Sequence, residues 1–253
     1  MTQKEIEDEL RRLAPFHHDV ELPYGLRTHI RELSRRELER TRVANLVKHV
    51  WPSLLNACGG SLNGQRVLDV ACNCGGFSFE ALKSGAEHVL GIDIVDRYLE
   101  QANFIKRAHG FEKIEFRKMS VEDLDEATIG RYDVTFCFGL LYHLENPVLV
   151  MRKLASVTRR LMVVDTSVFR SSFLREPAWV MRFVPPPKTE LLSTTALWRT
   201  KGICQLRPNA RAVTDLLTFV GFPKIKLIKP TLKELDKRYY SGMRLTFLAA
   251  RDA

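Results

Sequence analysis

The sequence of 253 residues contains no run of about 18 apolar residues, the length that a membrane-spanning helix needs. Its first residues, MTQKEIEDELRRL, are charged and do not form the basic and then apolar segment of a secretory signal. We therefore expect a cytoplasmic protein that does not bind membranes. With 45% hydrophobic and 27% charged residues, the composition is that of a globular chain dominated by one large domain.

Cysteine is also scarce. The five cysteines are an odd number without regular spacing, which does not describe a disulfide framework. Cys72 and Cys74 form a C-x-C pair, but a structural zinc site needs four ligands and a second pair is missing from the sequence. A redox pair favours C-x-x-C. We expect no metal here and interpret both thiols as small residues that line or back a loop.

No G-K-[ST] sequence for binding nucleotide phosphates occurs, and there is no internal repeat. The net charge of +9 is unevenly spread, because residues 166–253 hold 16 of the 39 lysines and arginines but 6 of the 30 acidic residues. This basic third indicates either a solvated surface or a site for an anionic substrate or nucleic acid.

Short apolar runs and helical patterns alternate through the chain. Strands are predicted at 66–71, 88–94, 113–118, 132–138, 160–165, 224–230 and 243–251, and helices at 77–85, 96–110, 146–157 and 208–222. The helix at 146–157 opens with Asn146 and Pro147, a capping residue and a first-turn residue, and Pro208 is expected in the first turn of the last helix. This alternation predicts a mainly parallel sheet in a doubly wound α/β core.

The regions outside this alternation differ from it. Residues 2–14 and 34–57 have helical patterns, so we predict a helical segment and lid over residues 1–57, followed by a Rossmann-like domain over 58–253. Residues 166–207 are rich in proline and tryptophan and lack regular periodicity, which suggests an inserted cap over the sheet.

The stretch LDVACNCGGFSFE, residues 68–80, lies between the first core strand and the first core helix, where open α/β sheets bind ligands. Glycine is favoured in such a turn because it adopts positive φ. Asn73 tolerates that conformation better than other residues, Ala71 is the smallest substitute, and Gly75 remains. We predict that Asn73 adopts a glycine-type backbone conformation. Asp93, at the end of the second strand, is expected to bind the ribose of an adenosine-containing cofactor, and the alternative is a helix cap.

Together, VLDVACNCGG, GIDI, SVEDL, YDVTFCFGLLYHLENP and RLMVVDT resemble the class I S-adenosylmethionine-dependent methyltransferases over about residues 40–250. The segments FCFGLLYHLENP and PNARAVTDLLTFVGF are most similar to the domain of the bacterial tRNA wobble-uridine carboxymethyl-transferring enzymes, a type shared with small-molecule methyltransferases. The resemblance implies a Rossmann-like, doubly wound seven-stranded sheet with N-terminal helices, and S-adenosylmethionine as cofactor with S-adenosylhomocysteine as product.

The resemblance also implies the cofactor-binding residues. Asp69, Ala71, Asn73 and Gly75 are expected to contact its amino-acid end, and Asp93 and Ile94 its ribose. Ser120, Val121 and Glu122 are expected to contact its adenine, and Phe138 and Gly139 to lie beside its methionine part. Ser120 departs from the acidic residue that the superfamily often has there, so Glu122, a neighbour or water would meet the adenine amino group.

Tyr142 and His143 follow the fourth strand and are the candidate catalytic residues. Tyr142 would orient the methyl group, and His143 would act as general base because its pKa is ordinarily near neutrality. The alternatives are a pocket wall for Tyr142 and a helix-entry residue for His143. The segment ELPYGLRTH has no lysine, whereas the carboxymethyl-transferring enzymes use one for their carboxylated cofactor. We therefore expect ordinary methyl transfer.

The methyl acceptor is the least determined part. Aromatic and basic residues of the cap and the lid favour a small aromatic or anionic molecule as the acceptor, with O or N as the methylated atom. The candidate substrate-binding residues are His18, Tyr24, Trp179, Arg182, Trp198 and Arg199. The basic last third favours RNA, in particular tRNA, as the alternative. A non-catalytic cofactor-binding protein is the third hypothesis, and the oligomeric state is not indicated.

Overall fold

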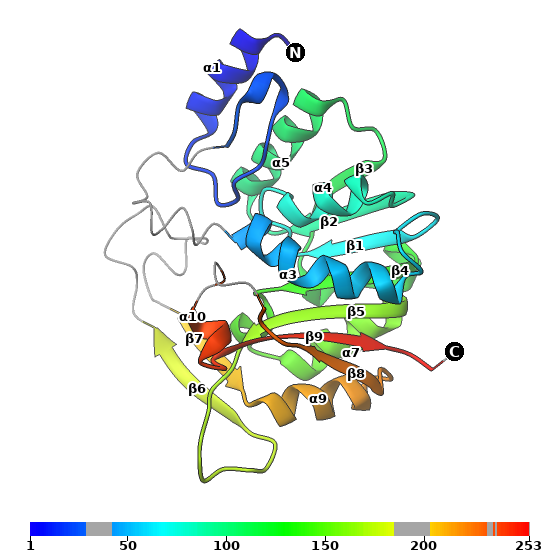
Figure 1. Ribbon diagram of the computed structural model, residues 1–253, viewed down its shortest axis with the longest axis vertical. Coiled ribbons are helices and arrows are strands. Elements are labelled where there is room, and N and C mark those ends of the chain that lie inside the picture. The colour runs from blue at the N-terminus through cyan, green and yellow to red at the C-terminus, as the bar shows by residue number, and fades with distance from the viewer. Residues whose placement is uncertain (29–41, 185–202, 232–234, 236, 253) are drawn as a thin grey trace. The chain divides into compact units, whose positions relative to one another are not determined.

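The computed structural model describes residues 1–28, 42–184, 203–231, 235 and 237–252 (Figure 1). Seven strands form a mixed sheet in the order β3-β2-β1-β4-β5-β9-β8, with helices flanking it, which confirms the predicted α/β fold. The chain divides into two compact units, one formed by residues 1–120 and 230–236 and the other by residues 121–229 and 237–253. In the described part of the chain, no helix is long and apolar enough to cross a membrane.

The first unit contains the three strands β1 (Arg66–Val70), β2 (His88–Asp93) and β3 (Ile114–Lys118), which are all parallel. The helices α4 (Gly76–Lys83) and α5 (Asp96–His109) follow β1 and β2. The ends of both helices lie within a residue or two of the predicted ends. The apolar runs before them form the buried strands β1 and β2, as their composition indicated.

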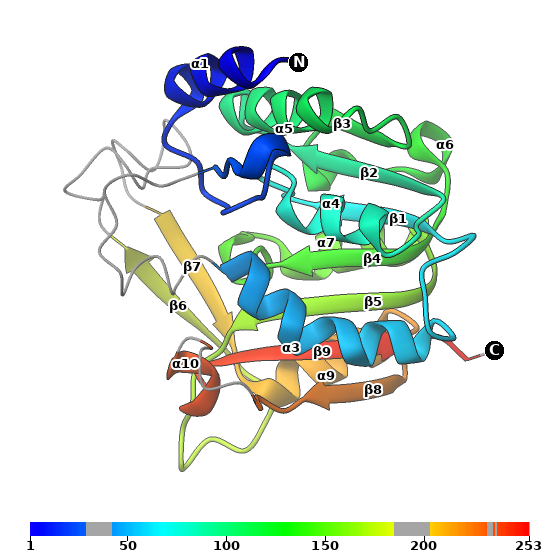
Figure 2. The same cartoon turned by 45° about the horizontal axis from the view of Figure 1, so that its top comes forward.

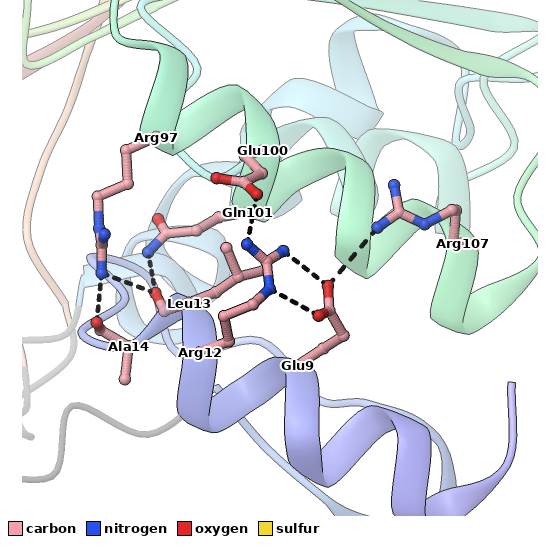
Figure 3. Close-up of polar contacts among 8 residues, drawn as sticks. All are labelled: Glu9, Arg12, Leu13, Ala14, Arg97, Glu100, Gln101 and Arg107. Carbon is pink, nitrogen blue, oxygen red and sulfur yellow. Dashed lines mark hydrogen bonds and ion pairs between the residues drawn. The ribbon is translucent and has the colours of Figure 1, made fainter.

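The N-terminal part of this unit consists of α1 (Gln3–Leu13), the short η1 (Pro23–Gly25) and α3 (Arg42–Ala57). Figure 3 shows α1 held along α5: Arg12 contacts Glu9 and Glu100, and Arg97 donates to the carbonyl oxygens of Leu13 and Ala14. The two helices also lie side by side in Figure 2. The helix predicted over 34–57 is confirmed from Arg42 on, and its first part lies outside the described residues.

The second unit contains the four remaining sheet strands: β4 (Tyr132–Phe138), β5 (Thr158–Ser167), β8 (Lys224–Ile228) and β9 (Arg244–Ala250). β4 and β5 are parallel, whereas β9 runs antiparallel to both β5 and β8. Its helices and short helical turns are η2 (Val121–Asp123), α6 (Glu126–Ile129), η3 (Leu141–His143), α7 (Pro147–Val157), α9 (Ala210–Phe219) and α10 (Lys237–Tyr240).

One of the two predicted helix starts was wrong in detail. Pro208 does not open the last helix but ends a strand, and Asn209 is the N-cap, accepting the backbone N–H of Ala212 at 2.8 Å. The prediction for α7 is confirmed, since Asn146 is its N-cap and Pro147 occupies the first turn, although the Asn146 side chain accepts no capping hydrogen bond. The error at Pro208 arises because proline marks a helix start only to within a residue or two.

An antiparallel hairpin was not predicted. β6 (Trp179–Val184) pairs with β7 (Ile203–Pro208) across the region predicted as a cap. The residues between them, including Trp198 and Arg199, lie outside the described residues. The sequence pattern of β6 and β7 is short and mixed, so its period of two did not stand out.

Candidate active site

The loop after β1 adopts the backbone that the sequence predicts. Asn73 has a φ of 55° and Ala71 one of 53°, both in the left-handed region, and Gly75 has a φ of 80°. This confirms the prediction for Asn73. Its side-chain oxygen accepts the backbone N–H of Cys74 at 2.8 Å, a local bond of the kind that makes asparagine tolerant of this conformation.

The glycines that remain are needed for space as well. A Cβ atom on Gly75 would lie 2.7 Å from Cζ of Phe116, a β3 residue, and one on Gly91 would lie 2.6 Å from Cδ1 of the same ring. A Cβ on Gly91 would also lie 3.0 Å from Sγ of Cys72, so that thiol packs behind the loop. The loop is therefore held closely against β2 and β3.

Burial keeps the two thiols of the loop in their protonated form. Cys72 and Cys74 are buried, and burial raises the pKa of Cys72 and raises that of Cys74 to about 12. Metal binding and thiol exchange both need the thiolate, which burial disfavours. Across the described ranges, no group of three or more His, Cys, Asp or Glu residues is arranged to hold a metal ion. That neither thiol binds a metal stays a prediction.

Asp93 fixes the loop from the end of β2. One carboxylate oxygen accepts the backbone N–H of Asn73 at 2.9 Å, and the other accepts that of Val95 at 3.0 Å. Asp93 is not the cap of α5, because Val95 is the N-cap residue. Burial raises the pKa of Asp93, while hydrogen bonding to the backbone of Val95, Asn73 and Ile94 acts in the opposite direction.

Asp69 is a second buried carboxylate in the same unit. Its exposed fraction is 1%, and Oδ2 accepts a hydrogen bond from the Ser78 hydroxyl at 2.6 Å. Burial raises the pKa of Asp69 to about 7, the Ser78 bond opposes this, and the charge of Asp93 adds to it. Within the described ranges, no cationic side chain acts on the pKa of either Asp69 or Asp93.

The predicted lid residues lie in different surroundings. His18 is buried, and its Nδ1 accepts the backbone N–H of Gly76 at 3.1 Å, so this ring contacts the first residue of α4. Tyr24 is 60% exposed, and its hydroxyl donates to the carbonyl oxygen of Met1 at 3.3 Å. Ile94 is exposed and Ser120 is half-buried in this unit.

In the second unit, the segment after β4 carries the candidate catalytic residues. Phe138 is half-buried, and Gly139 has a φ of 74° and donates its N–H to the carbonyl oxygen of Asp165 at 2.8 Å. Tyr142 is buried and its ring centroid lies 4.1 Å from that of His143, which is exposed. Of the predicted adenine contacts in η2, Val121 is half-buried and Glu122 is exposed.

A buried polar cluster beside this segment was missed by sequence reasoning. Asp165, at the end of β5, forms an ion pair with Arg244 of β9 and accepts hydrogen bonds from the hydroxyls of Tyr239 and Thr246, each at 2.8 Å. Arg244 Nε donates to the Tyr239 hydroxyl at 3.1 Å, whereas its Nη1 has no hydrogen-bond partner among the described residues. A charged residue beginning an otherwise apolar strand was the available signal.

The predicted cap residues are only partly described. Trp179 is half-buried and Arg182 is exposed, both on β6. Trp198 and Arg199 cannot be placed because they lie in the range that the structure does not describe. The two buried carboxylates and the left-handed loop of the first unit suit a positively charged ligand, because acids stabilise positive charge.

Residues 61–185 match the sequence model of a family described as a methyltransferase domain. Ubiquinone biosynthesis O-methyltransferase of Bordetella avium (strain 197N) is 39% identical over 126 residues, which are 49% of this chain and 49% of that protein. tRNA U34 carboxymethyltransferase of Alteromonas mediterranea (strain DSM 17117 / CIP 110805 / LMG 28347 / Deep ecotype) is 26% identical over 249 residues, 94% of this chain and 64% of that protein. This chain therefore matches about half of the length of the first relative and less than two thirds of the length of the second.

Solved structures share the fold. The N-terminal domain of EvdMO1, crystallised in the presence of SAH and D-fucose, has a TM-score of 0.70 and 22% identity, covering 100% of this chain and 98% of that one. Magnesium protoporphyrin IX methyltransferase of Synechocystis PCC 6803 with bound SAM has a TM-score of 0.57 and 17% identity, covering 87% and 86%. The predicted resemblance to class I methyltransferases is confirmed.

Proposed function

We propose that this chain, whose residues 61–185 match the sequence model of a methyltransferase domain, transfers the methyl group of S-adenosylmethionine to an oxygen or nitrogen atom of a small molecule. The observation that carries the proposal is the loop after β1, which combines left-handed Ala71 and Asn73 with the buried acids Asp69 and Asp93. The cofactor has no phosphates but carries an ammonium and a sulfonium group, which such carboxylates suit.

Each residue of the first unit has a separate task in this proposal. Asp69 holds the amino-acid end, and its raised pKa falls once an ammonium group lies beside it. Asp93 binds the ribose hydroxyls, because each of its oxygens accepts one backbone N–H and keeps a further lone pair. Ala71, Asn73, Gly75 and Ile94 supply the backbone around these groups, and Ser120 lies toward the adenine.

For residues of the second unit, the proposed roles are those that the family resemblance implies. Bound S-adenosylmethionine provides a methyl carbon that is already activated for in-line displacement. Tyr142 orients it, Phe138 and Gly139 lie beside the methionine part, and Val121 and Glu122 meet the adenine. His143 accepts the proton of an acceptor hydroxyl or amine, a role that its exposure to solvent permits.

Two measurements test the proposal directly. Calorimetry of the purified protein is expected to show S-adenosylmethionine binding at one site per chain, with ATP as a control that does not bind. A mass spectrum of the cofactor retained on purification is expected to show S-adenosylmethionine or its demethylated product. Carboxy-S-adenosylmethionine there would contradict methyl transfer, and no binding at all would favour a non-catalytic protein.

tRNA is the second candidate acceptor. It is supported by the likeness to tRNA U34 carboxymethyltransferase over 94% of this chain and by the basic charge of residues 166–253. Binding of tRNA that weakens steeply with salt concentration would favour it over a small molecule. Cytoplasmic location and a lid role for residues 1–57, with His18 and Tyr24 near the acceptor, belong to the same proposal.

A further inference from the structure

We propose that the β6–β7 hairpin forms a binding site for an oxyanion, a carboxylate or phosphate group of the methyl acceptor, built from Arg182, Gln205 and Arg207. That the anion belongs to the acceptor rests on the proposed function. The binding of an anion by the hairpin can be tested without methyl transfer.

The strand register brings these three side chains together. Arg182 and Gln205 are direct partners across the antiparallel pair, and Arg207 lies two residues beyond Gln205 on β7. Because successive side chains of a strand point to opposite faces, all three residues share one face of the hairpin. The other face carries apolar residues such as Met181 and Phe183.

Gln205 holds Arg207 in place without neutralising it. Gln205 is buried, with an exposed fraction of 7%, and its side-chain oxygen accepts hydrogen bonds from Nε and Nη2 of Arg207 at 3.1 and 2.8 Å. Arg207 itself is partly buried, and a guanidinium in such a place is usually paired with a carboxylate. A neutral amide fixes the orientation of the guanidinium and leaves its full charge for a ligand.

The electrostatic surroundings of Arg207 are positive. Burial lowers the pKa of Arg207, the charges of Arg182 and Arg238 lower it further, and Tyr142 acts in the opposite direction. Among the described residues, none of the groups that act on it is a carboxylate. Like charges gathered beside a partly buried guanidinium oppose folding, and a bound anion would relieve this repulsion.

The proposed anion site lies near the candidate catalytic residues Tyr142 and His143. β7 packs against η3, the turn that carries Tyr142 and His143. Arg207, Gln205 and these two residues all belong to the second unit. An anionic group held by Arg207 would therefore place the remainder of an acceptor near the residues proposed to act in methyl transfer.

Binding of inorganic phosphate and of benzoate, measured by calorimetry in chloride buffer at constant ionic strength, tests the site. At least one probe is expected to bind the wild-type protein, and the stronger one identifies the phosphate or the carboxylate as the preferred group. Arg207→Gln is expected to weaken binding by about 10- to 100-fold. Arg159→Gln is the matched control, because Arg159 is an exposed arginine of the same unit, paired with Asp133.

Gln205→Glu is the second variant. Glutamate has nearly the same shape and keeps both hydrogen bonds to Arg207, so the fold is retained, but its charge occupies the site and anion binding is lost. Absence of binding to the wild type, unchanged binding in both variants, or an equal loss in Arg159→Gln would overturn the inference. S-adenosylmethionine binding, measured on the same samples, fails only if the proposed function is wrong, so the two failures are distinguishable.

Discussion

The carboxylate of Asp93 accepts the backbone N–H of Asn73 at 2.9 Å, which joins the end of β2 to the left-handed loop after β1. The acid proposed to bind the ribose is therefore also the acid that shapes the loop. We therefore expect this one residue to affect both folding and cofactor binding.

Asp93→Ala is expected to lower the free energy of unfolding by about 2 kcal/mol, because the buried N–H of Asn73 and the partly buried N–H of Val95 lose their acceptor. Asp93→Asn retains one acceptor oxygen, so its free energy of unfolding should lie between those of the wild type and Asp93→Ala. Urea denaturation measures both. Asp96→Asn is the control, since Asp96 is a well-exposed acid three residues later, and an Asp93→Ala protein as stable as this control would contradict the account.

Ala71→Gly is expected to raise the free energy of unfolding by up to about 1 kcal/mol, because glycine removes the left-handed strain at a φ of 53° but makes the unfolded chain more flexible. Ala71→Val should destabilise the protein, since a branched side chain fits this conformation poorly. Ala108→Gly within α5 is the control and should lower stability by up to about 1 kcal/mol. Equal losses from both glycine substitutions would rule out the strain.

Asp69 predicts a dependence of stability on pH. Its pKa is about 7 in the folded protein against an ordinary value of 3.8, so the folded state retains a proton that the unfolded chain releases. Stability from this group is present below about pH 4 and is lost as the pH rises through 7. One pKa unit corresponds to about 1.4 kcal/mol, so the effect amounts to a few kcal/mol. Urea denaturation from pH 4 to 8 should show a flatter profile for Asp69→Asn than for the wild type, and identical profiles would refute the assignment.

Cofactor binding should have the opposite dependence on pH. If the Asp69 carboxylate pairs with the ammonium group of S-adenosylmethionine, affinity in the wild type rises between pH 6 and 8 and binding releases a proton. Calorimetry in two buffers of different ionisation enthalpy measures that proton. Asp69→Asn is expected to bind more weakly with no proton released. Proton release that persists in the variant would assign it to another group.

His143→Ala and His143→Asn test the general base. Turnover, followed as S-adenosylhomocysteine formation with an acceptor, is expected to fall by about 100-fold or more, while the affinity for S-adenosylmethionine stays unchanged. Tyr142→Phe is the companion variant, since it keeps the buried ring and removes the hydroxyl. Turnover within a few-fold of wild type in the His143 variants would show that His143 is not the general base.

The sequence by itself determined the order of strands and helices in the core, the methyltransferase resemblance and the glycine-type turn at Asn73. The order of the elements and the turn follow from local preferences, namely apolar periodicity and the backbone angles that each residue tolerates, whereas the resemblance rests on the likeness of several motifs to those of a known family. The position of Asp93 after its strand was equally readable, because the end of a parallel strand is a local feature.

The tertiary structure alone decided which distant groups meet. His18 contacts Gly76 across 58 residues, and Thr246 reaches Asp165 across 81. Neither contact leaves a period or a motif, because each depends on how the chain closes loops of that length. For the same reason only the structure placed Arg182 opposite Gln205 and β7 beside the turn of Tyr142, where the sequence showed only a basic region without regular pattern.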